Sequence, residues 1–219
     1  MHRAGLTECA AAARANVPRE RLRDAIDYRG DLTCDELRRL AAVLGLNEIG
    51  VCALGVGGYP RPEIGPLPFR VWPLRMPHGI GVANAYLVGE TGSSRAILFD
   101  TGAGSEALAA VWPETVRQVD AVFLTHGEQE HTGGLCGVVE RFQVSTAFAP
   151  RGILVPCTVA MGEGETHTFG SLRVRALTTP GHVAAHNCYL VDVAPDGSSG
   201  TLLISGDLVF AGSVGGAFY

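Results

Sequence analysis

The chain contains the segment Ala121-Val122-Phe123-Leu124-Thr125-His126-Gly127-Glu128-Gln129-Glu130-His131, in which four potential metal ligands directly follow a short apolar run. An apolar run of this length is consistent with a buried β-strand. A strand that ends in such a cluster brings imidazole and carboxylate groups to one edge of a sheet, and these groups bind divalent metals. The segment therefore predicts a metal site at a strand end, and with it a metalloenzyme.

The composition indicates a globular protein. The chain has 219 residues, of which 47% are hydrophobic, enough for a large core. The net charge is -5, so no overall positive field attracts nucleic acid or anionic membranes. All 17 basic residues are arginine, which excludes a Schiff base on lysine. No apolar run reaches membrane-spanning length and no secretory signal is evident, so we expect a cytoplasmic protein with no membrane contact.

The six cysteines are scattered along the chain and form no C-x-x-C pair. This spacing argues against a zinc ribbon or a compact disulfide framework. We therefore expect free thiols that serve mainly in packing.

Two compositional regions divide the chain. Residues 1–53 are rich in charge and show helical periodicity, with helices expected over 7–14, 19–28 and 35–44. Residues 54–67 are rich in glycine and proline and fit a linker. Residues 68–219 alternate short strand-like runs with Gly and Pro turns, and they add helices at 105–112 and 134–142. The expected strands are 70–74, 84–88, 96–99, 121–124, 144–148, 172–177, 188–193 and 201–204. This order indicates an α/β domain with packed sheets and outer helices.

The helical region resembles the helix-turn-helix core of bacterial repressor-type DNA-binding domains. The resemblance covers about forty residues and depends on their apolar spacing. Residues 1–60 contain eight arginines and eight acidic residues, whereas a protein that reads DNA needs a positive excess. We expect a small helical packing or dimerisation module, with DNA binding as the less favoured alternative.

Four motifs in the second region occur in an order that resembles the metallo-β-lactamase superfamily. They are Leu98-Phe99-Asp100-Thr101-Gly102, Thr125 to His131, Thr179-Pro180-Gly181-His182 and Ser205-Gly206-Asp207. The resemblance covers residues 68–219 and implies an αββα sandwich with a mono- or dinuclear metal site. The implied cofactor is one or two zinc ions.

The resemblance also implies a ligand set. His126, Glu128 and His182 would bind a first metal, while Glu130 and His131 would bind a second. Glu128 stands where the family usually has a histidine, and Glu130 stands where it usually has an aspartate. Asp207 would bridge the two metals, and Asp100 would orient a ligand from behind it.

The chemistry that such a site implies is hydrolysis by a metal-bound hydroxide, with Glu130 and Asp207 as the catalytic residues. Glu130 would orient the nucleophile and handle its proton. The run from Ser205 to Gly215 is similar to the corresponding segment of hydroxyacylglutathione hydrolases (glyoxalase II). An ester, a thioester or a related small molecule is therefore the expected substrate.

Two alternatives remain open. The carboxylates among the ligands favour iron or manganese over zinc, and a Glu in place of the second His also occurs in di-iron members of the superfamily. The first alternative is thus a di-iron redox enzyme. The second is a degenerate ligand-binding or regulatory protein whose helical segment contacts DNA or another protein.

In the family, a final helix and strand follow the Asp207 segment and carry a last histidine ligand. This chain stops at Tyr219, so we expect a C-terminally short form with an incomplete second metal site. The missing elements would leave apolar sheet surface exposed. Residues 1–50, or a second copy of the chain in a homodimer, are the candidates to cover that surface. Residues 77–83 are expected to form a loop that overhangs the site.

Overall fold

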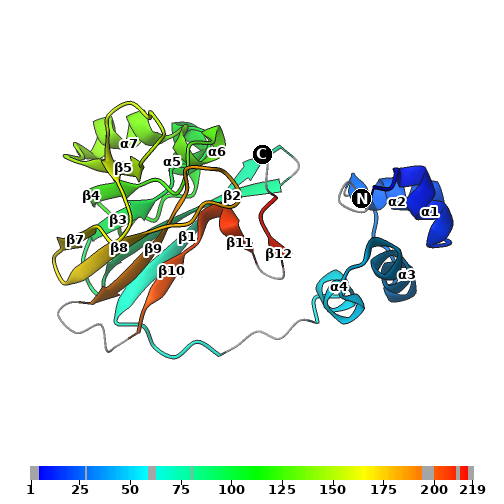
Figure 1. Cartoon of the computed structure of the whole chain (residues 1–219). Helices are drawn as coiled ribbons and strands as arrows, with labels where there is room; N and C mark the ends of the chain where they lie inside the picture. The colour runs from blue at the N-terminus through cyan, green and yellow to red at the C-terminus, as the bar shows by residue number, and fades with distance from the viewer. Residues whose placement is uncertain are drawn as a thin grey trace. The chain divides into compact units, whose positions relative to one another are not determined.

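The computed structural model describes residues 5–27, 29–58, 63–79, 81–193, 200–210 and 213–216 (Figure 1). The chain divides into two compact units, Met1–Glu63 and Ile64–Tyr219. No helix in the described ranges is long and apolar enough to span a membrane.

The first unit is helical. Its helices are α1 (Glu8–Arg14), α2 (Arg19–Ile26), α3 (Cys34–Leu44) and α4 (Glu48–Gly55). The start of α3 is fixed by a capping box between Thr33 and Glu36, and its end by Gly45 in the left-handed conformation. Helix α4 was not predicted, and its last two residues lie in the segment expected to be a linker. The side chain of Asn47 caps α4 by accepting a hydrogen bond from Gly50 N–H.

Ion pairs neutralise the arginines of α2. Arg21 contacts both oxygens of Glu36 at 2.8 Å, and Arg19 and Arg23 both pair with Glu8. The Arg21 guanidinium, together with the Thr33 N–H, lowers the pKa of Glu36 to about 2. The positive charge of α2 is therefore compensated inside the unit.

The second unit contains two main sheets. The six-stranded sheet runs in the order β1 (Phe69–His78), β2 (Gly81–Glu90), β3 (Arg95–Phe99), β4 (Gln118–Phe123), β5 (Ala147–Pro150) and β6 (Thr158–Met161). The four-stranded sheet runs in the order β10 (Leu202–Ile204), β9 (Asn187–Val193), β8 (Leu172–Thr178) and β7 (Thr166–Phe169). A small hairpin joins β11 (Val209–Phe210) to β12 (Ser213–Val214). The helical segments are α5 (Ser105–Ala110), α6 (Gln129–Thr132), α7 (Leu135–Phe142) and the 3-10 turn η2 (Gly206–Leu208).

The predicted packing of sheet on sheet is confirmed (Figure 1). Phe99 and Phe123 of the larger sheet stack at 5.4 Å and meet Tyr189 of the smaller sheet in the layer between them. The other face of the larger sheet packs under Leu108 of α5 and Leu135 of α7. Strands β6, β7, β11 and β12 were not predicted, because they are short and only partly apolar. Residues 77–79 and 81–83 belong mostly to the β1–β2 hairpin rather than to a free loop.

Strand order places the site. Strands β3 and β4 are adjacent and parallel, so their carboxyl ends meet at one edge of the larger sheet. Asp100 follows β3, and Thr125 lies just beyond β4. The smaller sheet is tied to this edge because Asn187 N–H donates to the Thr125 carbonyl at 2.9 Å.

Candidate metal centre

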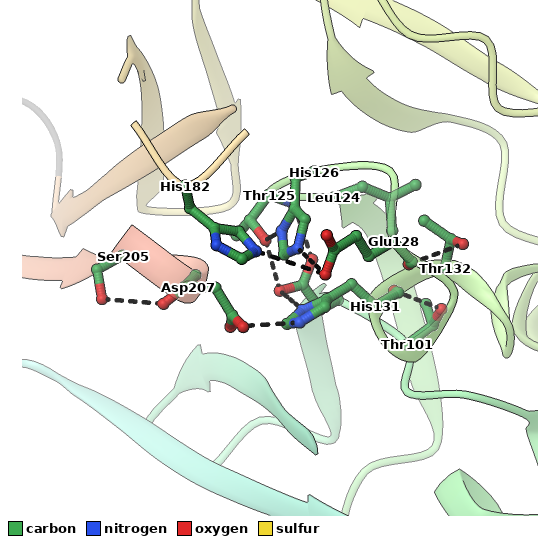
Figure 2. Close-up of polar contacts among 12 residues, drawn as sticks. Thr101, Leu124, Thr125, His126, Glu128, His131, Thr132, His182, Ser205 and Asp207 are labelled. Carbon is green, nitrogen blue, oxygen red and sulfur yellow. Dashed lines mark hydrogen bonds and ion pairs between the residues drawn. The ribbon is translucent and has the colours of Figure 1, made fainter. Parts of the chain in front are cut away.

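Three predicted ligands converge into a first group, which consists of His126, Glu128 and His182 (Figure 2). Oε2 of Glu128 lies 3.6 Å from Nε2 of His126 and 3.4 Å from Nε2 of His182. Ligand atoms about 2.0–2.1 Å from a tetrahedral ion lie roughly 3.3 Å apart. The observed spacing therefore suits one ion among the three residues.

A second group combines His131 and Asp207 with His126. Nε2 of His131 lies 3.3 Å from Oδ1 of Asp207. Glu130, which was predicted to be both a ligand and a catalytic residue, belongs to neither group, although it is half-buried on α6 next to His131. Asp207 falls only in the second group, so its bridging role stays a prediction.

A chain of hydrogen bonds fixes the imidazole of His126. Asp100 accepts the N–H of Thr125 at 2.7 Å and its hydroxyl at 2.8 Å. Because the hydroxyl has a single proton and donates it to Asp100, it accepts from Nδ1–H of His126 at 2.9 Å. The lone pair of His126 is thereby placed on Nε2, which faces the ligand group.

The other two imidazoles are oriented in the same way. Nδ1–H of His131 donates to Oδ2 of Asp100 at 2.9 Å, and the N–H and hydroxyl of Thr101 both donate to the His131 carbonyl. Nδ1–H of His182 donates to the carbonyl of Gly216 at 2.7 Å. All three histidines thus turn Nε2 toward the centre.

The donor set fits a divalent cation. Nε2 of His126 is buried and has no hydrogen-bond partner among the described residues, a state that is costly unless a ligand binds there. Burial, followed by the charge of His131, lowers the pKa of His126, so its ring is neutral and able to bind a metal. The lone pair on Nε2 of His126 lies 3.6 Å from the Glu128 carboxylate, and the two repel each other unless a cation lies between them.

The second group carries opposite charges. Burial alone would lower the pKa of His131, but the carboxylates of Asp100 and Asp207 overcome it and raise that pKa to about 10. Burial alone would raise the pKa of Asp207, but the hydrogen bond from His131 leaves it lowered. The pair is therefore ionised, and a metal that binds His131 must displace a proton.

Several supporting residues were not identified as functional from the sequence. The Thr125 hydroxyl connects Asp100 to His126 by hydrogen bonds to both. The only sequence signal for this role was its position at the end of a predicted strand. His186 lies fully buried with its ring 5.3 Å from that of His126. Gly206 packs closely against Thr125 and His186. A Cβ at this position would lie 2.6 Å from the Thr125 hydroxyl oxygen and 2.8 Å from Nε2 of His186.

A sandwich of two sheets with a histidine and carboxylate cluster at one edge defines a class of α/β proteins with a candidate metal centre. The family model described as the metallo-beta-lactamase superfamily matches residues 78–217. The chain belongs to this superfamily.

Similar proteins agree with that assignment. The chain is 30% identical over 131 residues to a hydroxyacylglutathione hydrolase of Klebsiella pneumoniae, covering 58% of this chain and 47% of that one. It is 35% identical over 115 residues to the thioesterase pkgB of Emericella nidulans, covering 50% of this chain and 32% of that one. The chain thus spans about half or less of the length of these curated relatives. A metallo-beta-lactamase from Staphylococcus aureus shares the fold, with a TM-score of 0.51, 17% identity and coverage of 68% of this chain and 46% of that one.

Proposed function

We propose that the protein is a metal-dependent hydrolase that cleaves an ester or thioester bond in a small-molecule substrate. The observation that carries the proposal is the convergence of the Nε2 atoms of His126 and His182 on the carboxylate of Glu128. Relatives named hydroxyacylglutathione hydrolase and thioesterase support this class of bond.

His126, Glu128 and His182 would hold a first cation. Both ligand groups include His126, but one Nε2 lone pair serves one ion, so His131 and Asp207 alone would remain for a second. We therefore propose one tightly bound ion and a second that binds weakly. The carboxylate of Glu128 makes the first site harder than an all-imidazole site, which favours iron or manganese as alternatives to zinc.

A bound cation would lower the pKa of a water molecule and polarise the acyl carbonyl oxygen. The chain's own contribution is proton handling by Asp207, whose carboxylate is ionised and partly exposed. It can orient the attacking water and accept its proton, and then return that proton to the leaving thiolate or alkoxide. The water oxygen forms a bond to the acyl carbon as the bond to sulfur or oxygen breaks. We assign this role to Asp207 rather than Glu130, because Glu130 is in neither ligand group.

Elemental analysis of the purified protein tests the metal assignment. We expect about one equivalent of tightly bound metal per chain, and that metal should be lost in both His126→Ala and His182→Ala. The exposed histidine His78 supplies the control, because His78→Ala should keep its metal. Unchanged metal content in His126→Ala would refute the ligand set. Two tightly bound iron ions would instead favour the di-iron redox alternative.

An assay on simple acyl thioesters tests the activity. Thioester loss should be followed by its own ultraviolet absorbance, because exposed Cys9, Cys136 and Cys157 would react with a thiol reagent. The metal-loaded protein should hydrolyse the thioester, and Asp207→Asn should lose most of that activity while keeping the first ion. Full activity in Asp207→Asn would remove Asp207 from the reaction.

A further inference from the structure

A cavity of about 400 Å³ opens beside the second ligand group. It lies between strands β1 and β2 on one side and the segment from β10 to β11 on the other. His131 and Asp207 line it, so the cavity begins where the proposed chemistry takes place. Its volume falls in the range of small-molecule pockets.

The walls of this cavity are largely apolar. The hydrophobic residues that line it include Val71 of β1, Leu202 and Leu203 of β10, and Val209 and Phe210 of β11. Leu203 and Val209 are each 50% exposed, and Phe210 is 41% exposed. Large apolar side chains that gather around one concave site, instead of being scattered singly, mark a surface that binds an apolar group.

Two neutral polar side chains accompany the apolar ones. Asn84 and Tyr86 lie two residues apart on β2 and therefore on the same face of the sheet, and both line the cavity. Neither side chain makes a hydrogen bond to another of the described residues. An amide and a phenol can both donate to a carbonyl oxygen without adding charge.

The cavity disfavours a carboxylate at the far end of an acyl chain. Its charged lining groups lie together where the chemistry is proposed, because His131 is ion-paired with both Asp207 and Asp100. The rest of the described lining contains no cationic side chain. A carboxylate at the far end of the chain would therefore be buried against apolar walls without a partner, which is unfavourable. Arg75, exposed and opposite Asn84 in the strand register, is not part of the lining.

We propose that this cavity binds the acyl chain of the substrate, and that the substrate class is an uncharged aliphatic acyl ester or thioester. The inference rests on the proposed hydrolase function, which it narrows to one kind of acyl group. The scissile carbonyl lies at the Asp207 end, and the chain extends along the walls formed by Leu203 and Phe210.

A substrate series with one leaving group tests the inference on the metal-loaded full chain. Acetyl, hexanoyl and adipoyl thioesters differ only in the acyl part, and adipoyl matches hexanoyl in length but ends in a carboxylate. We expect kcat/KM to rise from acetyl to hexanoyl by up to about fourfold per buried methylene. The adipoyl compound should lose at least about tenfold relative to hexanoyl. Equal rates for acetyl and hexanoyl, or a preference for adipoyl, would overturn the inference while leaving the hydrolase function in place.

A pair of variants locates the effect. Leu203→Glu puts a carboxylate into the cavity wall and should reduce the ratio of hexanoyl to acetyl activity. Leu154 is the matched control, because it is a fully exposed leucine outside the cavity. Leu154→Glu should keep the ratio of the unchanged protein. An unaltered ratio in Leu203→Glu would place chain recognition elsewhere.

Binding of methyl hexyl ketone separates this inference from the proposed function. The ketone has a carbonyl and an alkyl chain but no leaving group, so it reports on the cavity without hydrolysis. Calorimetric titration should show binding to the metal-loaded protein and at least about tenfold weaker binding to Leu203→Glu. No binding to the unchanged protein would refute the cavity assignment, whereas binding without thioester hydrolysis would refute the hydrolase function alone.

Discussion

Asp100 and His131 are joined by a hydrogen bond of 2.9 Å between Oδ2 and Nδ1, although 31 positions separate them in the chain. The same carboxylate accepts the backbone N–H and the hydroxyl of Thr125, which in turn orients His126. A single buried carboxylate thus controls one imidazole of each ligand group.

Asp100→Asn should weaken metal binding without unfolding the protein. Thr125 and His131 both donate hydrogen bonds to the Asp100 carboxylate. The NH2 group of an asparagine would face one of these donors and could not accept its hydrogen bond, so that imidazole would no longer be held in place. Asp100 has a positive φ of 59°, and asparagine tolerates this conformation, so the variant removes charge without backbone strain. We expect metal affinity to fall about 10- to 100-fold in competition with a chelator. Asp192→Asn, which alters an ion pair with Arg173 away from the site, should leave the affinity unchanged. Equal affinities in the two variants would contradict the role of Asp100.

Gly206→Ala should displace the turn that carries Asp207. The residue has a φ of +50°, and its new Cβ would press on Thr125 and on His186. We expect a loss of roughly 1–3 kcal/mol in the free energy of unfolding, together with most of the hydrolytic activity. Gly164 has a φ of +72° but open space around it, so Gly164→Ala isolates the backbone effect and should stay active. Denaturant melts and the thioester assay provide the readouts, and a fully active Gly206→Ala would show that the turn tolerates the shift.

The helical unit should lose stability in acid through Glu36. Its pKa in the folded state is about 2, below the ordinary value of 4.5. The stabilisation is therefore complete above about pH 4.5 and declines as the pH falls toward 2. Glu36→Gln keeps a side chain that suits the capping box but removes the charge, so its helical circular dichroism should depend less on pH over this window. The exposed Glu20 provides the control, and Glu20→Gln should retain the original profile. Identical profiles for all three proteins would contradict the assignment.

The helical unit should bind DNA weakly or not at all. The α2 arginines that a DNA backbone would need are held by Glu8 and Glu36. Binding would have to break these pairs before it gained phosphate contacts. Fluorescence anisotropy with random-sequence duplex DNA at low salt should stay flat up to micromolar protein. Tight binding that weakens steeply with added salt would instead support the regulatory alternative.

The sequence predicted the core of the fold because the larger strands have strong apolar runs. The motif positions were equally informative, since Asp100, His126 and Asp207 each follow a strand and strand ends gather at one edge. Short elements escaped prediction for the opposite reason. Strand β7, with the sequence Thr-His-Thr-Phe, gains its order from pairing with β8 rather than from its own composition.

The sequence could not show which neighbouring side chains of the motif face one centre, and Glu130 is an example. The family resemblance implied that every acid and imidazole from His126 to His131 would bind metal. The structure places Glu130 and His131 on the short helix α6, where successive side chains point about 100° apart. Only one of the two neighbours joins a ligand group. The contributions of Thr125 and of the Gly216 carbonyl depend on contacts that only the folded chain creates.

The first ligand group draws on both layers of the sandwich. His126 and Glu128 follow β4 of the larger sheet, whereas His182 lies between β8 and β9 of the smaller one. A cation bound by all three residues would therefore cross-link the two sheets. Because the ion would bind only the folded state, its binding would raise the free energy needed to separate the two sheets. Amide hydrogen exchange along β8 and β9 would then slow as the concentration of free metal rises. The smaller sheet would thus stay closed for longer where more metal is available.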